Sequence, residues 1–241
     1  LLENKTYAIL KGKLLIGDDA ILSCPKDTVF NIVKLDIDSK ITEWNYSVKN
    51  NFDASSSKLE YVDPDCKFDG IVDISMTNIK EWHNDVPGYF NGSGSKLEYV
   101  DPDCKFGGIV NVNDTNITEW HCDVPSYFDA CRSKLEFVNP ECKFGDDVDI
   151  NVTNIKEWHN DVGGNLKVQS SKIEKIVDCE IKGDLRAQGS DLEKIVNCEI
   201  KGNCDAQYSK LEKIINCDIK GEIYGKDNVE IVNEEKQTMR M

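Results

Sequence analysis

Apolar and polar residues recur along this chain with a short and nearly fixed period. From residue 39 onward each unit opens on a serine or threonine, and successive units are 18, 20, 18, 20, 18, 20, 18, 19 and 19 residues long. The opening residues are Ser39, Ser57, Thr77, Ser95, Thr115, Ser133, Thr153, Ser171, Ser190 and Ser209. A unit this short cannot bury its own apolar side chains, so the sequence predicts that each unit is one coil of a stack.

Within one unit the apolar positions predict very short strands. In residues 57–74, apolar and polar side chains alternate from Cys66 to Phe68 and from Val72 to Ile74. Period-two alternation is typical of half-buried strands, and the Asp, Pro and Gly residues between them favour turns. The sequence therefore predicts an all-β fold, a single elongated parallel β-solenoid (β-helix) of about ten to eleven coils.

Three kinds of coil divide the chain into segments. Residues 39–170 alternate between 18- and 20-residue coils, and residues 171–225 form uniform 19-residue coils. We term the 18-, 20- and 19-residue units short, long and uniform coils. We expect an N-terminal cap and a degenerate first coil in residues 1–38, and a C-terminal cap or tail in residues 226–241, because an open solenoid end exposes unpaired strand edges.

Residues at equivalent positions predict the buried columns of the stack. Four tryptophans align with Val or Ile of the other coils, and we expect them in the core: Trp44, Trp82, Trp120 and Trp158. Six cysteines are placed in one column together with valines of the short coils such as Val86: Cys66, Cys104, Cys142, Cys179, Cys198 and Cys217. A site that accepts cysteine or valine is buried, so we expect reduced thiols and a cytoplasmic protein. The first residues also lack the pattern of a secretory signal.

The spacing of apolar residues and glycine resembles a known repeat. It reads Leu59-x-x-Val62-x-Pro64-x-Cys66-x-Phe68-x-Gly70-x-Val72-x-Ile74, and the nearest local match is DVGGNLKV at residues 161–168. This is similar to the bacterial and phage leucine-rich-like solenoid repeat Leu-x-x-Leu-Pro-x-x-Leu-x-Val-Gly-Gly-x-Leu-x-Leu, although the proline is displaced or absent. The resemblance implies a solenoid used for interaction, with no catalytic residues to transfer.

The negative charge of the chain is concentrated in its middle. The net charge is −15, and residues 57–170 hold 21 acidic residues against 10 basic ones. A surface of this charge repels nucleic acid and lipid headgroups and attracts basic protein surfaces. A solvated exterior that keeps the protein soluble is the alternative interpretation.

One position of the repeat predicts a row of carboxylates on the surface. Six residues beyond the first apolar residue of successive coils stand Asp65, Asp85, Asp103, Asp123, Glu141 and Asp161. Like charges stacked about 4.8 Å apart disfavour folding, so such a row suggests a partner of opposite charge. The alternative is that these side chains serve the corner turns by accepting backbone hydrogen bonds.

The three histidines of the chain, His83, His121 and His159, each stand in the motif Trp-His-x-Asp. Their position alternates with Asp or Asn in the long coils, so we expect each histidine to pair with a neighbouring aspartate. Histidines in every second coil lie about 9.6 Å apart, too far for two of them to bind one metal ion. The sequence therefore predicts no metal site, and a histidine held at a corner by hydrogen bonds is the alternative to a binding role.

A further row alternates aromatic residues with glutamate. Tyr61, Tyr99 and Phe137 belong to the long coils, glutamates take their place in the short coils, and lysines follow in the uniform coils. If the row faces solvent, its rigid rings and charges resemble the composition of protein interfaces. If it faces the core, the rings serve packing.

The motifs of common enzymes are missing from the sequence. Neither a nucleophile–base pair, nor a phosphate-cradling glycine loop, nor a metalloprotease HExxH motif stands out. Glycan-cleaving β-helical enzymes build their clefts from large loop insertions, and these coils have almost none. The sequence therefore predicts a nonenzymatic protein without a cofactor.

The predicted function is protein interaction through the acidic face of residues 57–170. We expect the partner to be a basic protein surface, such as that of a nucleic-acid-binding enzyme inhibited in a bacterial or phage-infected cell. We expect no direct binding of nucleic acid or membrane. Two alternatives stay open, an exported adhesin or glycan-binding repeat protein and a structural β-solenoid that self-assembles.

Overall fold

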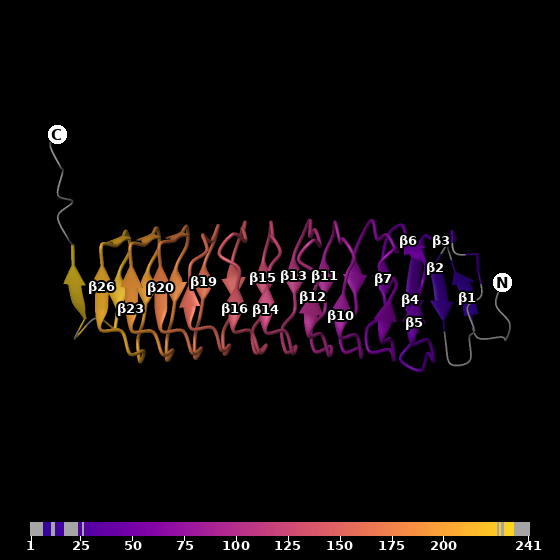
Figure 1. Ribbon diagram of the computed structural model, residues 1–241, viewed down its shortest axis with the longest axis horizontal. Helices are drawn as coiled ribbons and strands as arrows, with labels where there is room; N and C mark the ends of the chain where they lie inside the picture. The colour runs from indigo at the N-terminus through magenta and orange to yellow at the C-terminus, as the bar shows by residue number, and fades with distance from the viewer. Residues whose placement is uncertain are drawn as a thin grey trace, which may run out of the picture.

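The computed structural model describes residues 7–10, 13–16, 24–25, 27–225, 227 and 229–233. Over these residues the chain is all-β and forms a parallel β-solenoid of about 11 coils, as the sequence predicts. Figure 1 shows the coils stacked along one axis, from the indigo N-terminal strands to the yellow C-terminal strands. The described part of the chain contains no helical segment with the length and apolarity of a transmembrane span.

Each coil has three sides, which we number in chain order. Side 1 carries β5 (Glu43–Trp44), β8 (Tyr61–Val62), β10 (Glu81–Trp82), β12 (Tyr99–Val100), β14 (Glu119–Trp120), β16 (Phe137–Val138), β18 (Glu157–Trp158), β20 (Lys175–Val177), β23 (Lys194–Val196), β26 (Lys213–Ile215) and β29 (Glu230–Val232). Side 2 carries β3 (Val29–Phe30), β6 (Ser47–Val48), β21 (Glu180–Ile181), β24 (Glu199–Ile200) and β27 (Asp218–Ile219). Between β6 and β21, side 2 is held by single bridges such as Val86 to Phe106.

Side 3 is the continuous side of the stack, a 13-stranded sheet. It consists of β1 (Tyr7–Leu10), β2 (Lys13–Ile16), β4 (Ile32–Leu35), β7 (Phe52–Asp53), β9 (Val72–Asp73), β11 (Phe90–Asn91), β13 (Val110–Asn111), β15 (Phe128–Asp129), β17 (Val148–Asp149), β19 (Leu166–Lys167), β22 (Leu185–Arg186), β25 (Cys204–Asp205) and β28 (Ile223–Tyr224). All pairs in this sheet are parallel except β1 with β2, which is antiparallel. The parallel ladder from β2 to β28 fixes the rise per coil at about 4.8 Å.

Two stretches precede and follow the regular coils. Strands β3 and β4 pair with β6 and β7, so residues 29–35 supply sides 2 and 3 of a coil before Ser39. Strand β29 pairs with β26 and extends side 1. Residues 1–6, 11–12, 17–23 and 26 of the predicted cap and residues 226, 228 and 234–241 of the predicted tail lie outside the described residues.

The core contains a continuous column of aromatic rings. The predicted burial of the tryptophans is confirmed, since all four are at most 1% exposed. Successive rings of the column have centroids 4.7–5.7 Å apart. In order they are Trp44, Phe52, Phe68, Trp82, Phe90, Phe106, Trp120, Phe128, Phe144 and Trp158. Short coils supply rings on sides 1 and 3 and long coils supply one on side 2, so large and small residues complement each other from coil to coil.

Five of the six cysteines of the predicted column are buried and Cys217 is half-buried, but their partners in the short coils were predicted wrongly. Val86 pairs with Phe106 and not with Cys104. The position equivalent to Cys66 and Cys104 is taken in the short coils by Asn84, Cys122 and Asn160, which are 1–2% exposed. The reason is that the two extra residues of a long coil loop out between sides 1 and 2, so a count from the first apolar residue loses register beyond that corner.

Burial keeps the thiols of this column protonated. It raises the pKa of Cys66, Cys104 and Cys142 to about 12 each. The described cysteines are all free, and the Sγ atoms of Cys179 and Cys198 lie 3.6 Å apart. The column therefore behaves as packing rather than as reactive thiolate.

The serine or threonine that opens each unit closes the corner between side 3 and the next coil. From Thr77 to Ser209 its hydroxyl donates to the carbonyl three residues earlier, as in Thr153 to Ile150 at 2.8 Å. The preceding residue turns the chain with a positive φ, which is 59° at Val152. A β-branched residue is strained in this left-handed region.

We expect Val152→Asn to raise the free energy of unfolding by about 1 kcal/mol, because asparagine tolerates this conformation. Val152 is 52% exposed, so little burial is lost. Urea denaturation followed by circular dichroism measures the gain. Val152→Ala keeps a Cβ without the branch, and should gain less. An unchanged midpoint for the asparagine variant would show that the corner is not strained.

Candidate partner-binding face

Between residues 61 and 159, the outward residues of side 1 and of the adjoining corner form one acidic and aromatic surface, which we term the side-1 face. Its members are Tyr61, Asp63, Asp65, Glu81, His83, Tyr99, Asp101, Asp103, Glu119, His121, Phe137, Asn139, Glu141, Glu157 and His159. Eight of these residues are carboxylates, and none is lysine or arginine. The strands present them outward because their neighbours in the chain, the Trp, Val and Cys residues, point into the core.

The aromatic row of the side-1 face points to solvent. Tyr61, Tyr99 and Phe137 are 43%, 42% and 44% exposed. The register pairs Glu81 with Tyr99 and Glu119 with Phe137, so each ring has a carboxylate beside it in the previous coil. Packing therefore does not account for these rings. Partial burial and the nearby carboxylates raise the pKa of the Tyr61 and Tyr99 hydroxyls, which stay protonated and can donate hydrogen bonds.

His83 joins an acid on either side of it. Its Nδ1 lies 3.2 Å from Asp101 Oδ2, and its Nε2 lies 3.3 Å from Glu81 Oε2. Its ring lies beside that of Tyr99 at a tilt of 50°, with centroids 5.8 Å apart. The backbone amide of Asp103 and the hydrogen bond from His83 lower the pKa of Asp101. The predicted pairing of histidine with aspartate is confirmed at this position.

The other two histidines contact glutamates of their own coils. Nε2 of His121 lies 3.1 Å from Glu119, and that of His159 lies 3.4 Å from Glu157. His121 also lies beside the ring of Phe137, with centroids 5.8 Å apart. The prediction that aspartate is the partner is therefore wrong for these two. Each glutamate stands two residues earlier on the same strand face, within reach of the ring.

Three of the predicted carboxylates stand on ridges at the corner between sides 1 and 2. Asp65, Asp103 and Glu141 lie in the loops that the extra residues of the long coils form, and all three are exposed. Their backbone amides donate to the side chain two residues earlier, as Asp65 does to Asp63 Oδ1 at 2.9 Å. This turn leaves the ridge carboxylate itself free to meet a ligand.

The other three predicted carboxylates do not continue that row, so the prediction of one row of six is wrong. Asp85, Asp123 and Asp161 lie at the start of side 2, where each accepts a backbone amide of the next coil at 2.7–2.8 Å. For Asp85 and Asp123 the donors are Lys105 and Lys143. The alternative interpretation, that these side chains serve the backbone, holds for these three. The loop of the long coils displaces them from the ridge row.

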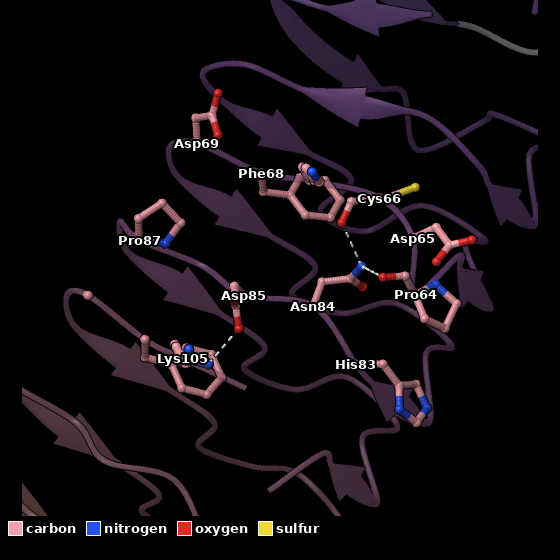
Figure 2. A pocket seen from close by; sticks show the side chains of 13 residues that line it. Pro64, Asp65, Cys66, Phe68, Asp69, His83, Asn84, Asp85, Pro87 and Lys105 are labelled. Atoms are coloured by element: carbon pink, nitrogen blue, oxygen red, sulfur yellow. Dashed lines mark hydrogen bonds between the residues drawn. The ribbon is translucent and has the colours of Figure 1, made fainter. Parts of the chain in front are cut away.

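Between the ridges, the shorter corners of the short coils leave notches. The first notch has a volume of about 650 Å³ and is lined by Pro64, Asp65, His83, Asn84 and Asp85 among others. Figure 2 shows the side chain of Asn84 lying between the Pro64–Asp65 ridge and Asp85, with His83 below it. The second notch, of about 520 Å³, lies between the ridges of Asp103 and Glu141 over His121, Cys122 and Asp123.

Asn84 forms the floor of the first notch and was missed by the sequence analysis. Its Nδ2 donates to the carbonyls of Asp63, Pro64 and Cys66 at 2.9–3.1 Å, which fixes the orientation of the amide. Its Oδ1 is buried without a hydrogen-bond partner. The available signal was its place in the short coil, which is equivalent to Cys66 once the corner loop is taken into account.

No metal centre is formed by the side chains that are described: no group of three or more His, Cys, Asp or Glu residues among them could hold an ion. The face can instead accept hydrogen bonds, attract cations and offer ring faces for stacking. No family model matches the chain, and neither the curated proteins nor the solved structures compared with it give a match. The resemblance to leucine-rich-like repeats therefore stays a prediction.

Proposed function

We propose that this protein is a nonenzymatic interaction module whose side-1 face binds a basic protein surface. The observation that carries the proposal is the composition of that face, with eight carboxylates and three exposed aromatic rings in straight rows and neither lysine nor arginine. Residues 57–170 also hold most of the excess negative charge of the chain.

The electrostatics of the face favour a cationic partner. Carboxylates in neighbouring coils repel each other, and an opposing lysine or arginine relieves that repulsion. The ring faces of Tyr61, Tyr99 and Phe137 attract the same cations. Because the rows are held by a stacked backbone, binding orders few groups that were not already ordered.

The proposed partner class includes enzymes that bind nucleic acid. Such enzymes present clustered lysine and arginine side chains that contact phosphates, and an acidic rod competes for those side chains. The finer proposal is that the protein inhibits such an enzyme in a bacterial or phage-infected cell. Competition with the nucleic acid at the enzyme surface is the expected kinetic pattern.

The test removes the ridge charges and measures binding to a fluorescent nona-arginine peptide. Asp65→Asn, Asp103→Asn and Glu141→Gln are combined in one variant. A matched control, Asp73→Asn with Asp129→Asn and Asp149→Asn, removes the same number of charges from side 3. We expect the ridge variant to bind about tenfold more weakly, because each lost ion pair contributes about 0.5 kcal/mol.

We expect the control variant to bind nearly as well as the wild type, and wild-type affinity to fall steeply with salt. Equal losses in the two variants would show that only net charge matters and would contradict a specific face. Binding that ignores salt would contradict the electrostatic mechanism. Salt-tolerant binding of soluble glycans would instead favour the glycan-binding alternative, for which the exposed aromatic row is the supporting observation.

A further inference from the structure

The groups of the side-1 face repeat every second coil. The exposed rings belong to β8, β12 and β16, and the ridge carboxylates Asp65, Asp103 and Glu141 follow these same strands. The strands of side 3 pair in register through this region, so equivalent residues lie in lines parallel to the solenoid axis. Neighbouring parallel strands are about 4.8 Å apart, which places equivalent groups about 9.6 Å apart.

This distance discriminates between the conformations that a bound polypeptide could adopt. A polyproline II helix returns to the same side every three residues, or about 9.3 Å. A β-strand returns every two residues, or about 6.8 Å. An α-helix returns after seven residues, or about 10.5 Å, and drifts around its axis as it does so. Over the two intervals between three rings, the accumulated mismatch is about 0.6 Å for polyproline II and about 1.8 Å for an α-helix.

We propose that the side-1 face binds an extended cationic segment in the polyproline II conformation, with an arginine at every third residue, running along the solenoid axis. The inference rests on the proposed function and names the kind of basic partner. Each arginine meets one unit of the face, which consists of a ring, the carboxylates on either side of it and the adjacent notch.

The unit around Tyr99 shows why arginine fits better than lysine. The guanidinium is planar and has five N–H donors, so it can stack on the exposed ring and still donate to carboxylates at its edge. Glu81 lies beside the ring in the previous coil, and Asp101 stands two residues after it on the same face. The compact ammonium group of lysine cannot stack in this way.

A second observation in the first notch points to a donor-bearing ligand. Asn84 is 2% exposed, and its Oδ1 has no donor although its Nδ2 is fully used. An unpaired buried acceptor is costly, and because this Oδ1 is covered in the free protein, a ligand N–H would satisfy it only by displacing the groups that cover it as the ligand enters the notch. The flanking rings of Pro64 and Pro87 line the same notch and offer apolar walls for an aliphatic stem.

The test compares two peptides of identical composition by fluorescence anisotropy. One is Arg-Pro-Pro repeated four times, and its isomer has the four arginines together followed by the eight prolines. Proline holds the repeated peptide and the proline block of its isomer in the extended conformation. We expect the repeated peptide to bind at least about tenfold tighter, because more of its arginines reach a ring and a carboxylate in register. We expect the corresponding Lys-Pro-Pro peptide to bind more weakly than the Arg-Pro-Pro peptide, although the two peptides carry the same charge.

A protein variant tests the notch separately. Asn84→Cys introduces the residue that the next notch already carries as Cys122, so the fold should be retained, which circular dichroism checks. We expect several-fold weaker binding of the repeated peptide and an unchanged affinity for its isomer. Equal binding of the repeated peptide by the variant and the wild type would show that water alone fills the notch, and would overturn this part of the proposal.

Different binding results would contradict the spacing proposal and the proposed function. If the isomer with contiguous arginines binds as tightly as the repeated peptide, the spacing proposal is wrong. The proposed function then stands as long as both peptides lose affinity for the ridge variant. If neither peptide binds the wild type at low salt, the proposed function itself fails.

Discussion

Replacing Trp120 with alanine is expected to lower the free energy of unfolding by about 3–5 kcal/mol. The side chain is 1% exposed, and its ring lies 5.7 Å from Phe106 and 4.7 Å from Phe128, measured between centroids. Its Nε1 donates to the carbonyl of Cys122 at 2.8 Å. The substitution thus interrupts the aromatic column and removes the donor of a buried carbonyl at the corner of the same coil.

The consequence for a solenoid is larger than the loss of one residue. Stability in a stack comes from the interfaces of each coil with its two neighbours, and Trp120 contributes to both interfaces of its coil. We therefore expect the unfolding transition to broaden as the two halves of the stack uncouple. Chemical denaturation followed by far-ultraviolet circular dichroism measures this, and hydrogen exchange should show earlier opening near β14.

Phe137→Ala provides the matched control. Phe137 is an aromatic residue in the adjacent coil, paired in register with Glu119, but it is 44% exposed. We expect its removal to change the free energy of unfolding by less than about 1 kcal/mol. Similar losses of stability in the two variants would contradict the structure, in which the ring of Trp120 points into the core and that of Phe137 points outward.

Replacing Gly145 with alanine is expected to cost about 3 kcal/mol, at the upper end of the usual range for overpacking. Gly145 lies at the corner between sides 2 and 3, where its amide donates to the carbonyl of Val124 in the previous coil at 2.9 Å. An added Cβ would overlap the carbonyl oxygen of Pro125 and lie 2.7 Å from its carbonyl carbon. The obstructing atoms belong to the backbone, so the coils can accommodate the methyl group only by separating.

Asp146→Ala tests the adjacent residue of the same corner. The carboxylate of Asp146 is exposed and accepts a hydrogen bond from the amide of Asp147 at 2.9 Å. This local bond contributes little to the stability of the fold. We expect a loss below about 1 kcal/mol. Thermal and urea denaturation of the two variants should therefore differ clearly. Equal stability of Gly145→Ala and the wild type would contradict the close approach of the two coils at this corner.

The sequence predicted the columns that precede the corner loop and failed on those that follow it. A count from the first apolar residue correctly places Trp120 opposite Val138. The same count places Val124 opposite Cys142, whereas the backbone pairs Val124 with Phe144. The difference of two residues between long and short coils is visible in the sequence, but the point at which they loop out is fixed only when the backbone groups of side 2 pair.

In the candidate site, too, positions before the corner loop could be predicted and positions after it could not. Tyr61, Tyr99 and Phe137 could be predicted as one row because they stand before the loop. The separation of Asp65 from Asp85 could not be predicted, because it depends on the backbone hydrogen bonds that form at each of the two positions. The role of Asn84 was also hidden, since a buried asparagine is stable only when neighbouring carbonyls accept its amide, and those carbonyls belong to the preceding coil.

By itself, the sequence determined the stack, its period, the burial of its tryptophans and the concentration of acidic charge, because each of these follows from residue types repeated at fixed intervals. Only the tertiary structure decided which acidic residues share a surface and where the notches lie. The physical reason is that a row on a solenoid is defined across coils. A loop of two residues, which hardly changes the repeat in the sequence, shifts every later side chain to a different neighbour.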